Sequence, residues 1–470
     1  MIDITSVPSG LGGSILLLAE VNEAELGPFV LASVLLSLIV IYLAAKLGGE
    51  LCARVNLPSV LGELVGGVVV GVSALNLIVF PEGAEPVHSV LMDFVQLTAH
   101  LDADALTAVF KGESEVISVL AEIGVVILLF EIGLESDLKE LIRVGPQAAV
   151  VAIVGVVVPF VAGTAGLIAF FNVSTIPAIF AGAALTATSI GITAKVLAEM
   201  QTLSSREGQI IIGAAVLDDV LGIIVLAVVA SLAKTGEIEI ANVIFLIIGA
   251  AVFLVGSILV GRLLSPLFVS LVDNLQTRGQ VLISSLVFAF VLSYIAAAIQ
   301  LEAILGAFAA GLILAETTKR KELEEQISHI ADMLVPVFFV TVGAHTDISV
   351  LNPLNPANRE GLIIASFLVV VAIIGKIVTG FTVFGQDGIN RLAIGVGMIP
   401  RGEVGLVFAG VGAASGVLSE SLDAAIIVMV IFTTFIAPPL LRVVFDTGDD
   451  DPSCPTDTDA SQEMAEASAE

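Results

Sequence analysis

The chain has little charge, few basic residues and almost no cysteine. Charged residues make up 14% of its 470 residues, and 18 Lys and Arg stand against 46 Asp and Glu, for a formal net charge of −28. A surface of this sign repels nucleic acid and anionic lipid headgroups, so nucleic acid is not an expected partner, whereas the lipid bilayer is. Cysteine occurs only as Cys52 and Cys454, which implies no disulfide framework.

What the chain has in quantity is apolar sequence. Hydrophobic residues make up 57% of it, the mean hydropathy is +1.07, and the apolar runs are far longer than a buried strand. We therefore predict an all-α polytopic membrane protein with about thirteen spans of near the ~20 residues that cross a bilayer. The predicted spans are 28–48, 58–79, 116–135, 146–171, 176–199, 207–233, 240–263, 279–299, 302–316, 331–349, 361–384, 389–415 and 420–444.

The positions of the basic residues predict the orientation. With the N-terminus outside, twelve Lys and Arg fall on the inner side and three on the outer side. This bias follows the positive-inside rule. We expect a multi-pass protein of the plasma (cytoplasmic) membrane with its C-terminus in the cytoplasm. No basic segment precedes the first apolar run, so a cleaved signal peptide is not expected.

Two adjacent carboxylates, Asp218 and Asp219, interrupt the apolar span 207–233. A charge at the membrane centre costs at least roughly 2.5 to 3.5 kcal/mol, so such acids mark a functional site unless a cation matches them. Lys376 lies centrally in the span 361–384 and is the expected partner, in preference to an isolated snorkelling lysine. For Lys195, near a span end, snorkelling toward the inner face is the favoured interpretation.

The two halves of the chain show an internal repeat. Residues 60–71 (VLGELVGGVVVG) match 304–315 (ILGAFAAGLILA), and 124–138 match 334–348. The matched spans are an odd number of spans apart, which predicts an inverted-topology repeat, the architecture of many secondary transporters.

Extending the repeat pairs span 176–199 with span 389–415, and each is interrupted at mid-depth. The first interruption carries three hydroxyls and the second carries a Pro-Arg-Gly-Glu sequence. Paired interruptions predict two crossed discontinuous helices at an ion site. The alternative, hydroxyls bonded back to the preceding helical turn, is favoured for one residue but not for three. The candidate residues at the interruptions are Thr186, Thr188, Ser189, Pro400, Arg401 and Glu403.

These motifs together resemble a known family. GAAVLDDVLGIIVLAVV, LTATSIGITAKVL, Gly375-Lys376 and PRGEVGLVFA are similar to the cation/proton antiporters of the sodium/hydrogen exchanger superfamily, in the electrogenic branch with paired aspartates, of NapA type. The likeness covers nearly all of residues 28–444. It implies a homodimer in which Asp219 is the main ion- and proton-binding carboxylate and Lys376 pairs with Asp218.

The resemblance also implies a division of the chain into domains. It assigns an extracellular N-terminal segment, a dimerisation domain in two parts, a core ion-transport domain in two parts, a linker helix and an acidic, disordered cytoplasmic tail. The N-terminal segment is 1–27 and the dimerisation domain is 28–135 with 279–349. The core domain is 146–233 with 361–444. The linker helix is 240–263 and the tail is 445–470.

The expected function is electrogenic Na⁺/H⁺ antiport by alternating access. Protons and Na⁺ would compete for one site, with Asp219, Asp218 and Thr188 as Na⁺ ligands and Li⁺ or K⁺ as other candidate cations. No cofactor is expected, and the protein is not expected to be an enzyme.

Two alternatives remain open at this point. A Kef-type K⁺/H⁺ antiporter would usually carry a nucleotide-binding domain after the membrane part. An intramembrane aspartyl protease would need its acids on two helices. The sequence leaves the selectivity, the stoichiometry and the pH of activation undecided.

Three further features are polar. Residues 446–470 carry nine acids and no Lys or Arg, a composition typical of disorder, and 80–115 forms a long acidic loop. The acidic surface resembles that of proteins from salt-loaded, halophilic cytoplasm. His345, at the outer end of span 331–349, is a candidate pH sensor, although a solvated interfacial side chain is the favoured interpretation.

Overall fold

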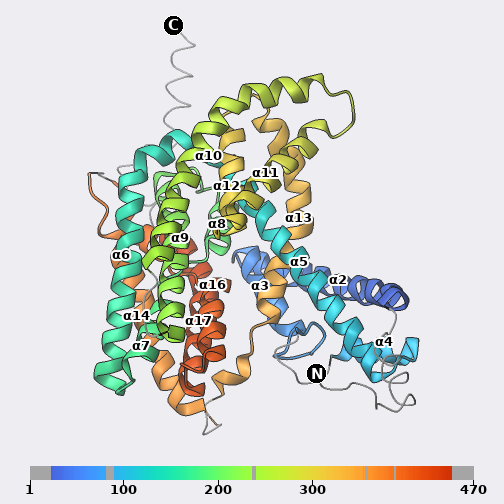
Figure 1. Cartoon of the computed structure of the whole chain (residues 1–470), viewed down its shortest axis with the longest axis vertical. Helices are drawn as coiled ribbons and strands as arrows, with labels where there is room; N and C mark the ends of the chain where they lie inside the picture. Colours follow the sequence, from blue (N-terminus) through green and yellow to red (C-terminus); the bar gives the residue numbers. More distant parts are fainter. Residues whose placement is uncertain are drawn as a thin grey trace, which may run out of the picture. The chain divides into compact units, whose positions relative to one another are not determined.

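The computed structural model describes residues 23–80, 89–235, 240–352, 354, 358–385 and 388–446, and all regular structure in these residues is helical (Figure 1). The first half contains α2 (Glu23–Arg54), α3 (Ser59–Val70), α4 (Val90–Ala99), α5 (Ala103–Glu135), α6 (Leu138–Phe171), α7 (Thr175–Ala184), α8 (Ile190–Glu199) and α9 (Arg206–Thr235). The second half contains α10 (Ile240–Asn274), α11 (Gln280–Ala298), α12 (Ala303–Ala315), α13 (Arg320–Ala344), the 3₁₀ helix η1 (Ile348–Leu351), α14 (Asn358–Gly380), α15 (Arg391–Gly397), α16 (Glu403–Ala414) and α17 (Glu420–Asp446).

Nine helices of the described residues are long and apolar enough to cross a membrane. These are α2, α5, α6, α9, α10, α11, α13, α14 and α17. The other four predicted spans fall on the short helices α3 and α12 and on the helix pairs α7/α8 and α15/α16. The all-helical membrane fold is confirmed, whereas the count of thirteen spans stays a prediction.

The prediction of a long loop at 80–115 was wrong for most of its described residues. Helix α4 lies within it, and α5 begins at Ala103 instead of near residue 116. Acidic residues concealed the helical pattern, but Met92, Val109 and Phe110 lie on one side of these helices and pack with Leu26 of α2 in a separate apolar cluster. Burial of that apolar side stabilises the helices in spite of their charge.

Several other boundaries also differ from the prediction: α3 ends at Val70 and not at 79, and α6 begins at Leu138 and not at 146. Helix α10 continues past the predicted span to Asn274, and α13 begins at Arg320, eleven residues before the predicted start at 331. The extension of α13 is mainly polar, so a hydropathy pattern does not register it, whereas the extension of α10 is mostly apolar and continues through Pro266. Residues 1–22 and 447–470, which include most of the predicted N-terminal segment and tail, lie outside the described residues.

The described residues fall into two units by their contacts. One consists of residues up to Gly48, Gly62–Gly124 and Met333–Asp347, and the other of Gly49–Leu61, Val125–Asp332 and the residues from Ile348 onward. Every residue of the candidate ion site belongs to the second unit. The predicted division into dimerisation and core domains stays a prediction.

Each unit contains a close glycine crossing at positions that the predicted repeat makes equivalent. In the first unit, a methyl group on Gly67 of α3 would overlap the Val340 carbonyl oxygen, and one on Gly343 of α13 would overlap the Leu64 carbonyl oxygen. Only glycine permits backbones to approach this closely.

The second unit contains the matching crossing of α12 with α5. A methyl group on Gly311 would overlap the Phe130 carbonyl oxygen, and one on Gly133 would overlap the Phe308 carbonyl oxygen. The alignment pairs Gly67 with Gly311, Gly133 with Gly343, Phe130 with Val340 and Leu64 with Phe308. Each contact in one unit therefore has its counterpart in the other, and the inverted orientation of the repeat stays a prediction.

The helices that hold the candidate site pack directly on one another. Helix α6 contacts both α9 and α14, and α14 contacts α17 (Figure 1). The start of α6 is fixed by Asp137, whose carboxylate accepts hydrogen bonds from the amides of Lys139 and Glu140, and its end by Asn172 in the left-handed conformation. Between these caps, α6 packs on α7, α9 and α14.

Candidate functional site

Two helices are broken at the predicted positions. Helix α7 ends at Ala184 and α8 resumes at Ile190, while α15 ends at Gly397 and α16 resumes at Glu403. Pro400, in the second break, lacks an amide donor and disfavours helix at the residue before it. Each break leaves carbonyl and amide groups without helical partners inside an apolar protein, so these groups require partners from elsewhere.

The two breaks provide partners for each other. The amide of Ser189 donates to the Pro400 carbonyl oxygen at 2.8 Å. The hydroxyl of Thr188 donates to the Met398 carbonyl oxygen at 3.2 Å, and that of Thr193 donates to Gly397 at 2.9 Å. These bonds hold the unwound segments side by side at one depth.

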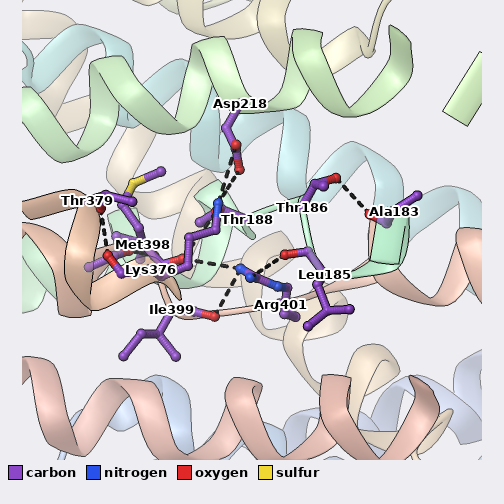
Figure 2. Close-up of polar contacts among 12 residues, drawn as sticks. Ala183, Leu185, Thr186, Thr188, Asp218, Lys376, Thr379, Met398, Ile399 and Arg401 are labelled. Carbon is purple, nitrogen blue, oxygen red and sulfur yellow. Dashed lines mark hydrogen bonds and ion pairs between the residues drawn. The ribbon is translucent and has the colours of Figure 1, made fainter. Parts of the chain in front are cut away.

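Arg401 connects the C-terminal ends of both N-terminal half-helices. Its guanidinium donates to the Leu185 carbonyl oxygen at 2.6 Å, to Met398 at 3.2 Å and to Ile399 at 3.3 Å (Figure 2). Helix C-terminal ends carry partial negative charge, so a buried cation is favourable there. The hydroxyl of Thr434 on α17 donates to the Arg401 carbonyl oxygen, which fixes the backbone of the same residue.

Asp218 on α9 and Lys376 on α14 form an ion pair beside this crossing. The Lys376 Nζ lies 3.2 Å from Oδ2 and 3.4 Å from Oδ1 of Asp218, and both side chains are fully buried (Figure 2). Gly155 on α6 leaves the space for the ammonium, because a Cβ there would lie 3.1 Å from Nζ. The contact expected for Lys376 is present, while the role of the pair in ion binding stays a prediction.

The described charges of the site balance. Asp218 and Asp219 are 0% and 3% exposed, and Lys376 and Arg401 are both 0% exposed. Asp218 interacts electrostatically with both cations, and Lys376 also interacts with Asp219. Two carboxylates thus stand opposite two cations, which makes burial of all four tolerable.

The three predicted hydroxyls differ in their partners. Thr186 donates back to the Ala183 carbonyl oxygen at 2.7 Å, as hydroxyls commonly do in helices. Thr188 donates across the crossing, so its oxygen lone pairs stay available to a cation. The Ser189 hydroxyl is buried without a hydrogen-bond partner among the described residues, and a Cβ on Gly402 would lie 2.7 Å from it.

The remaining predicted residues have varied surroundings. Pro400 contributes its carbonyl oxygen, and Glu403 begins α16. Lys195 interacts electrostatically with Glu131 and Glu135 of α5, away from the crossing.

The favoured interpretation of His345, a solvated interfacial side chain, is corrected by the structure, in which the residue is half-buried. Its ring stacks on Phe80 with centroids 3.9 Å apart, and its Nδ1 lies 2.9 Å from the Thr341 carbonyl oxygen.

Sequence reasoning missed Gly155, Thr193 and Thr434 as members of the site. Thr193 could have been recognised, because it follows Ser189 by one helical turn and therefore faces the same side. Nothing in the sequence indicates that Gly155 lies opposite Lys376, since that proximity depends on how α6 and α14 pack.

The donor set suits a hard monovalent cation. Carboxylate, hydroxyl and carbonyl oxygens converge at the crossing, and such cations prefer oxygen ligands. Among the described residues, His, Cys, Asp and Glu form no cluster of three or more that could hold a metal ion.

Comparisons with known proteins agree with this chemistry. The family model "Sodium/hydrogen exchanger, transmembrane" matches residues 34–446. The chain is 71% identical over 426 residues to the high-affinity Na⁺/H⁺ antiporter NhaS3 of Synechocystis sp., covering 90% of this chain and 92% of that protein. It is 32% identical to the Na⁺/H⁺-K⁺ antiporter GerN of Bacillus cereus, covering 87% of this chain and 95% of GerN.

A solved structure has a related fold. The sodium proton antiporter MjNhaP1 of Methanocaldococcus jannaschii aligns with a TM-score of 0.62 at 15% identity, over 89% of this chain and 98% of that one. At this identity the likeness concerns the fold alone.

Proposed function

The chain belongs to the sodium/hydrogen exchanger family, and from that premise we propose that it exchanges Na⁺ for H⁺ across a membrane at Asp218, Asp219 and Lys376. The observation that carries the proposal is a fully buried Asp218–Lys376 ion pair beside two broken helices. A purely structural core does not require such a pair, since apolar residues of similar volume stabilise as well or better. The high identity to an Na⁺/H⁺ antiporter supports Na⁺ as the cation.

The balance of charges in the site explains why Na⁺ entry would be coupled to proton release. With Asp218, Asp219, Lys376 and Arg401 all ionised, the described site is neutral, so an entering Na⁺ adds a charge unless a proton leaves. Lys376 is the group that can lose one. Its ammonium is paired with Asp218, and a cation that takes over this carboxylate removes the contact that holds the proton.

The two loaded states then differ by one charge. In the Na⁺ state, both aspartates are ionised, Lys376 is neutral, and the sum over Na⁺, Arg401 and the aspartates is zero. In the proton state, Asp219 and Lys376 each hold a proton, and the sum is one positive charge. Two protons therefore exchange for one Na⁺, and transport is electrogenic.

Each site residue has its own part in this scheme. Asp219, Asp218 and Thr188 bind Na⁺, with Ser189 as a further oxygen ligand, while Arg401 holds the two breaks together and Pro400 keeps the second break unwound. The core, 146–233 and 361–444, moves against the dimerisation domain and exposes the site to each side in turn. The assembly is a homodimer with the N-terminus outside and the C-terminus in the cytoplasm.

Neither alternative function is favoured. The relative with 71% identity is named for Na⁺/H⁺ exchange and GerN, at 32%, for Na⁺/H⁺-K⁺ exchange, and both are antiporters and not enzymes. Asp218 and Asp219 also lie next to each other on a single helix, about 100° apart, which is unlike two catalytic acids facing one water.

Purified protein in proteoliposomes with an imposed pH gradient tests the function. Added Na⁺ is expected to dissipate the gradient, and K⁺ is expected to do so less effectively at equal concentration. A gradient that responds to K⁺ and not to Na⁺ would transfer the assignment to the K⁺/H⁺ alternative.

A further inference from the structure

A carboxylate joins the inner end of the half-helix α8 to the beginning of α3. Glu199, the last residue of α8, accepts a hydrogen bond from the Ser59 amide at 2.8 Å through Oε2 and one from the Ser59 hydroxyl through Oε1. Ser59 is the first residue of α3, so its amide is one of the donors that a helix leaves unpaired at its N-terminus. Glu199 thus caps a helix that lies 140 residues away in the chain.

The residues around Ser59 group with the unit that holds the ion site. Residues 49–61, which are the end of α2, its connection to α3 and the first residues of α3, belong to this second unit by their contacts, although the chain on both sides belongs to the first. Helix α8, at the other end of the contact, runs directly from the break at Ser189 to Glu199. The contact therefore joins the start of α3 to α8, and α8 begins next to the candidate ion site.

The contact is open to water, which suits a bond that breaks and reforms. Glu199 is exposed, and the contact lies at an open cavity of about 610 Å³ whose polar lining includes Asn56, Ser59, Glu199, Gln201, Thr202 and Arg442. Exposed charge-assisted contacts contribute little stability, because water competes for both partners. Water can replace the Ser59 donors when the contact opens, so no buried carboxylate is left unpaired.

We propose that Ser59 and Glu199 form a latch that must open in every transport cycle. The inference rests on the proposed function, in which α8 moves with the core and α3 stays with the dimerisation domain. The latch holds the inner end of α8 on the α2–α3 connection and stabilises the conformation described here. When the core moves, Glu199 leaves the α3 N-terminus and both groups become hydrated.

Reversible crosslinking tests the latch. The variant Ser59→Cys/Glu199→Cys is prepared with Cys52→Ala and Cys454→Ala, and it is treated in proteoliposomes with a short bifunctional methanethiosulfonate reagent. Cysteine is shorter than glutamate, so a reagent with a short spacer suits the pair better than a direct disulfide. We expect the crosslink to lower Na⁺-driven proton flux at least tenfold and reduction to restore it.

A matched pair within the predicted dimerisation domain serves as control. Ser73 donates to the Thr346 carbonyl oxygen at 2.5 Å, so Ser73→Cys/Thr346→Cys joins two residues that the proposed motion leaves together. Crosslinking of this control should leave the flux within twofold of its starting value.

Two results would overturn the latch. One is full flux in protein whose Ser59–Glu199 crosslink is verified by mass spectrometry. The other is failure of this pair to crosslink while the control pair reacts. Failure of the proposed function itself is distinguishable, because the uncrosslinked variant and the unmodified protein would then both lack Na⁺-driven flux.

Discussion

At the scale of single residues, the proposed function assigns two different tasks to Asp218 and Asp219. Successive helical residues point about 100° apart, so both cannot face the same partner. Asp218 faces Lys376 at 3.2 Å, and Asp219 is buried next to it. This placement leaves Asp219 as the proposed titrating group and Asp218 as the proposed counter-charge of the lysine.

Replacing Asp219 by Asn should abolish exchange and leave the protein folded. The amide keeps the volume of the carboxylate but neither titrates nor carries the charge that attracts a cation. Na⁺-dependent pH change in vesicles and thermal melting of the purified variant measure the two effects. Robust Na⁺-dependent exchange by the folded Asn variant would refute the assignment of Asp219.

Replacing Lys376 by Gln should destabilise the protein and change the charge carried per cation. Asp218 would be left buried without its partner, which costs roughly 3 to 5 kcal/mol in a dry site and less in a wet one. Thermal stability and current on a solid-supported membrane check the prediction. The matched control is Lys195→Gln, because Lys195 is only half-buried and lies outside the crossing.

The account of Lys376 requires both changes. Unchanged melting together with unchanged charge per cation would show that the lysine is neither the partner of Asp218 nor a proton carrier.

His345→Gln should move the activity–pH profile by less than one pH unit. The ring packs on Phe80 and bonds a carbonyl oxygen of its own helix, which is a structural role that does not involve the ion site. Exchange measured across a series of buffers checks this prediction. A shift of a full unit would establish the histidine as a pH sensor.

Sequence reasoning predicted the charged residues of the site more completely than its packing. Asp218, Asp219, Lys376 and Arg401 were identifiable because charge within an apolar span has few structural explanations. Gly155 was not, because a glycine in a membrane helix is common and its value here depends on which side chain lies opposite.

At the scale of helices, the breaks and the glycine crossings serve opposite purposes. The breaks expose polar backbone groups in the second unit, where Arg401 and the hydroxyls of Thr188 and Thr193 provide their partners. The crossings at Gly67/Gly343 and Gly133/Gly311 bring the backbones of two helices into direct contact. Rigid crossings of this kind suit elements against which a site moves.

Gly67→Ala and Gly311→Ala should destabilise the protein by similar amounts. Overpacking of a filled contact typically costs about 1–3 kcal/mol, and the two positions are equivalent in the predicted repeat. Gly249→Ala is the control, since a methyl group there meets no atom within 4 Å and alanine is the better helix former.

Thermal unfolding in detergent measures the three variants side by side. A neutral effect of Gly311→Ala together with a large effect of Gly67→Ala would contradict the equivalence and, with it, the inverted repeat.

The helices also show why one part of the fold escaped prediction. Apolar runs of about 20 residues identified the long spans, because lipid selects for length and composition. Helix α4 and the start of α5 are stabilised instead by one apolar side on a charged background, with Met92 and Phe110 in a small cluster. A hydropathy window averages that apolar side with the acids around it, so it detects neither α4 nor the start of α5.

At the scale of the whole molecule, the net charge of −28 and the transport chemistry are separate properties. The candidate site has two acidic and two basic side chains, so the excess of acids resides in other parts of the sequence. Adaptation to a salt-loaded cytoplasm and the twelve-to-three distribution of basic residues both stay predictions. The orientation they indicate assigns the Ser59–Glu199 contact to the cytoplasmic side.

Electrogenic exchange at one site is the central claim, and the ratio of protons to Na⁺ tests it most directly. The most direct measurement is the Na⁺ gradient at which net flux stops in proteoliposomes held at zero voltage with a fixed pH gradient. A tenfold proton gradient supplies about 1.4 kcal/mol per proton, so two protons per Na⁺ balance a Na⁺ gradient of about a hundredfold. The account predicts this hundredfold balance, and flux that stops at a Na⁺ gradient of about tenfold would contradict it.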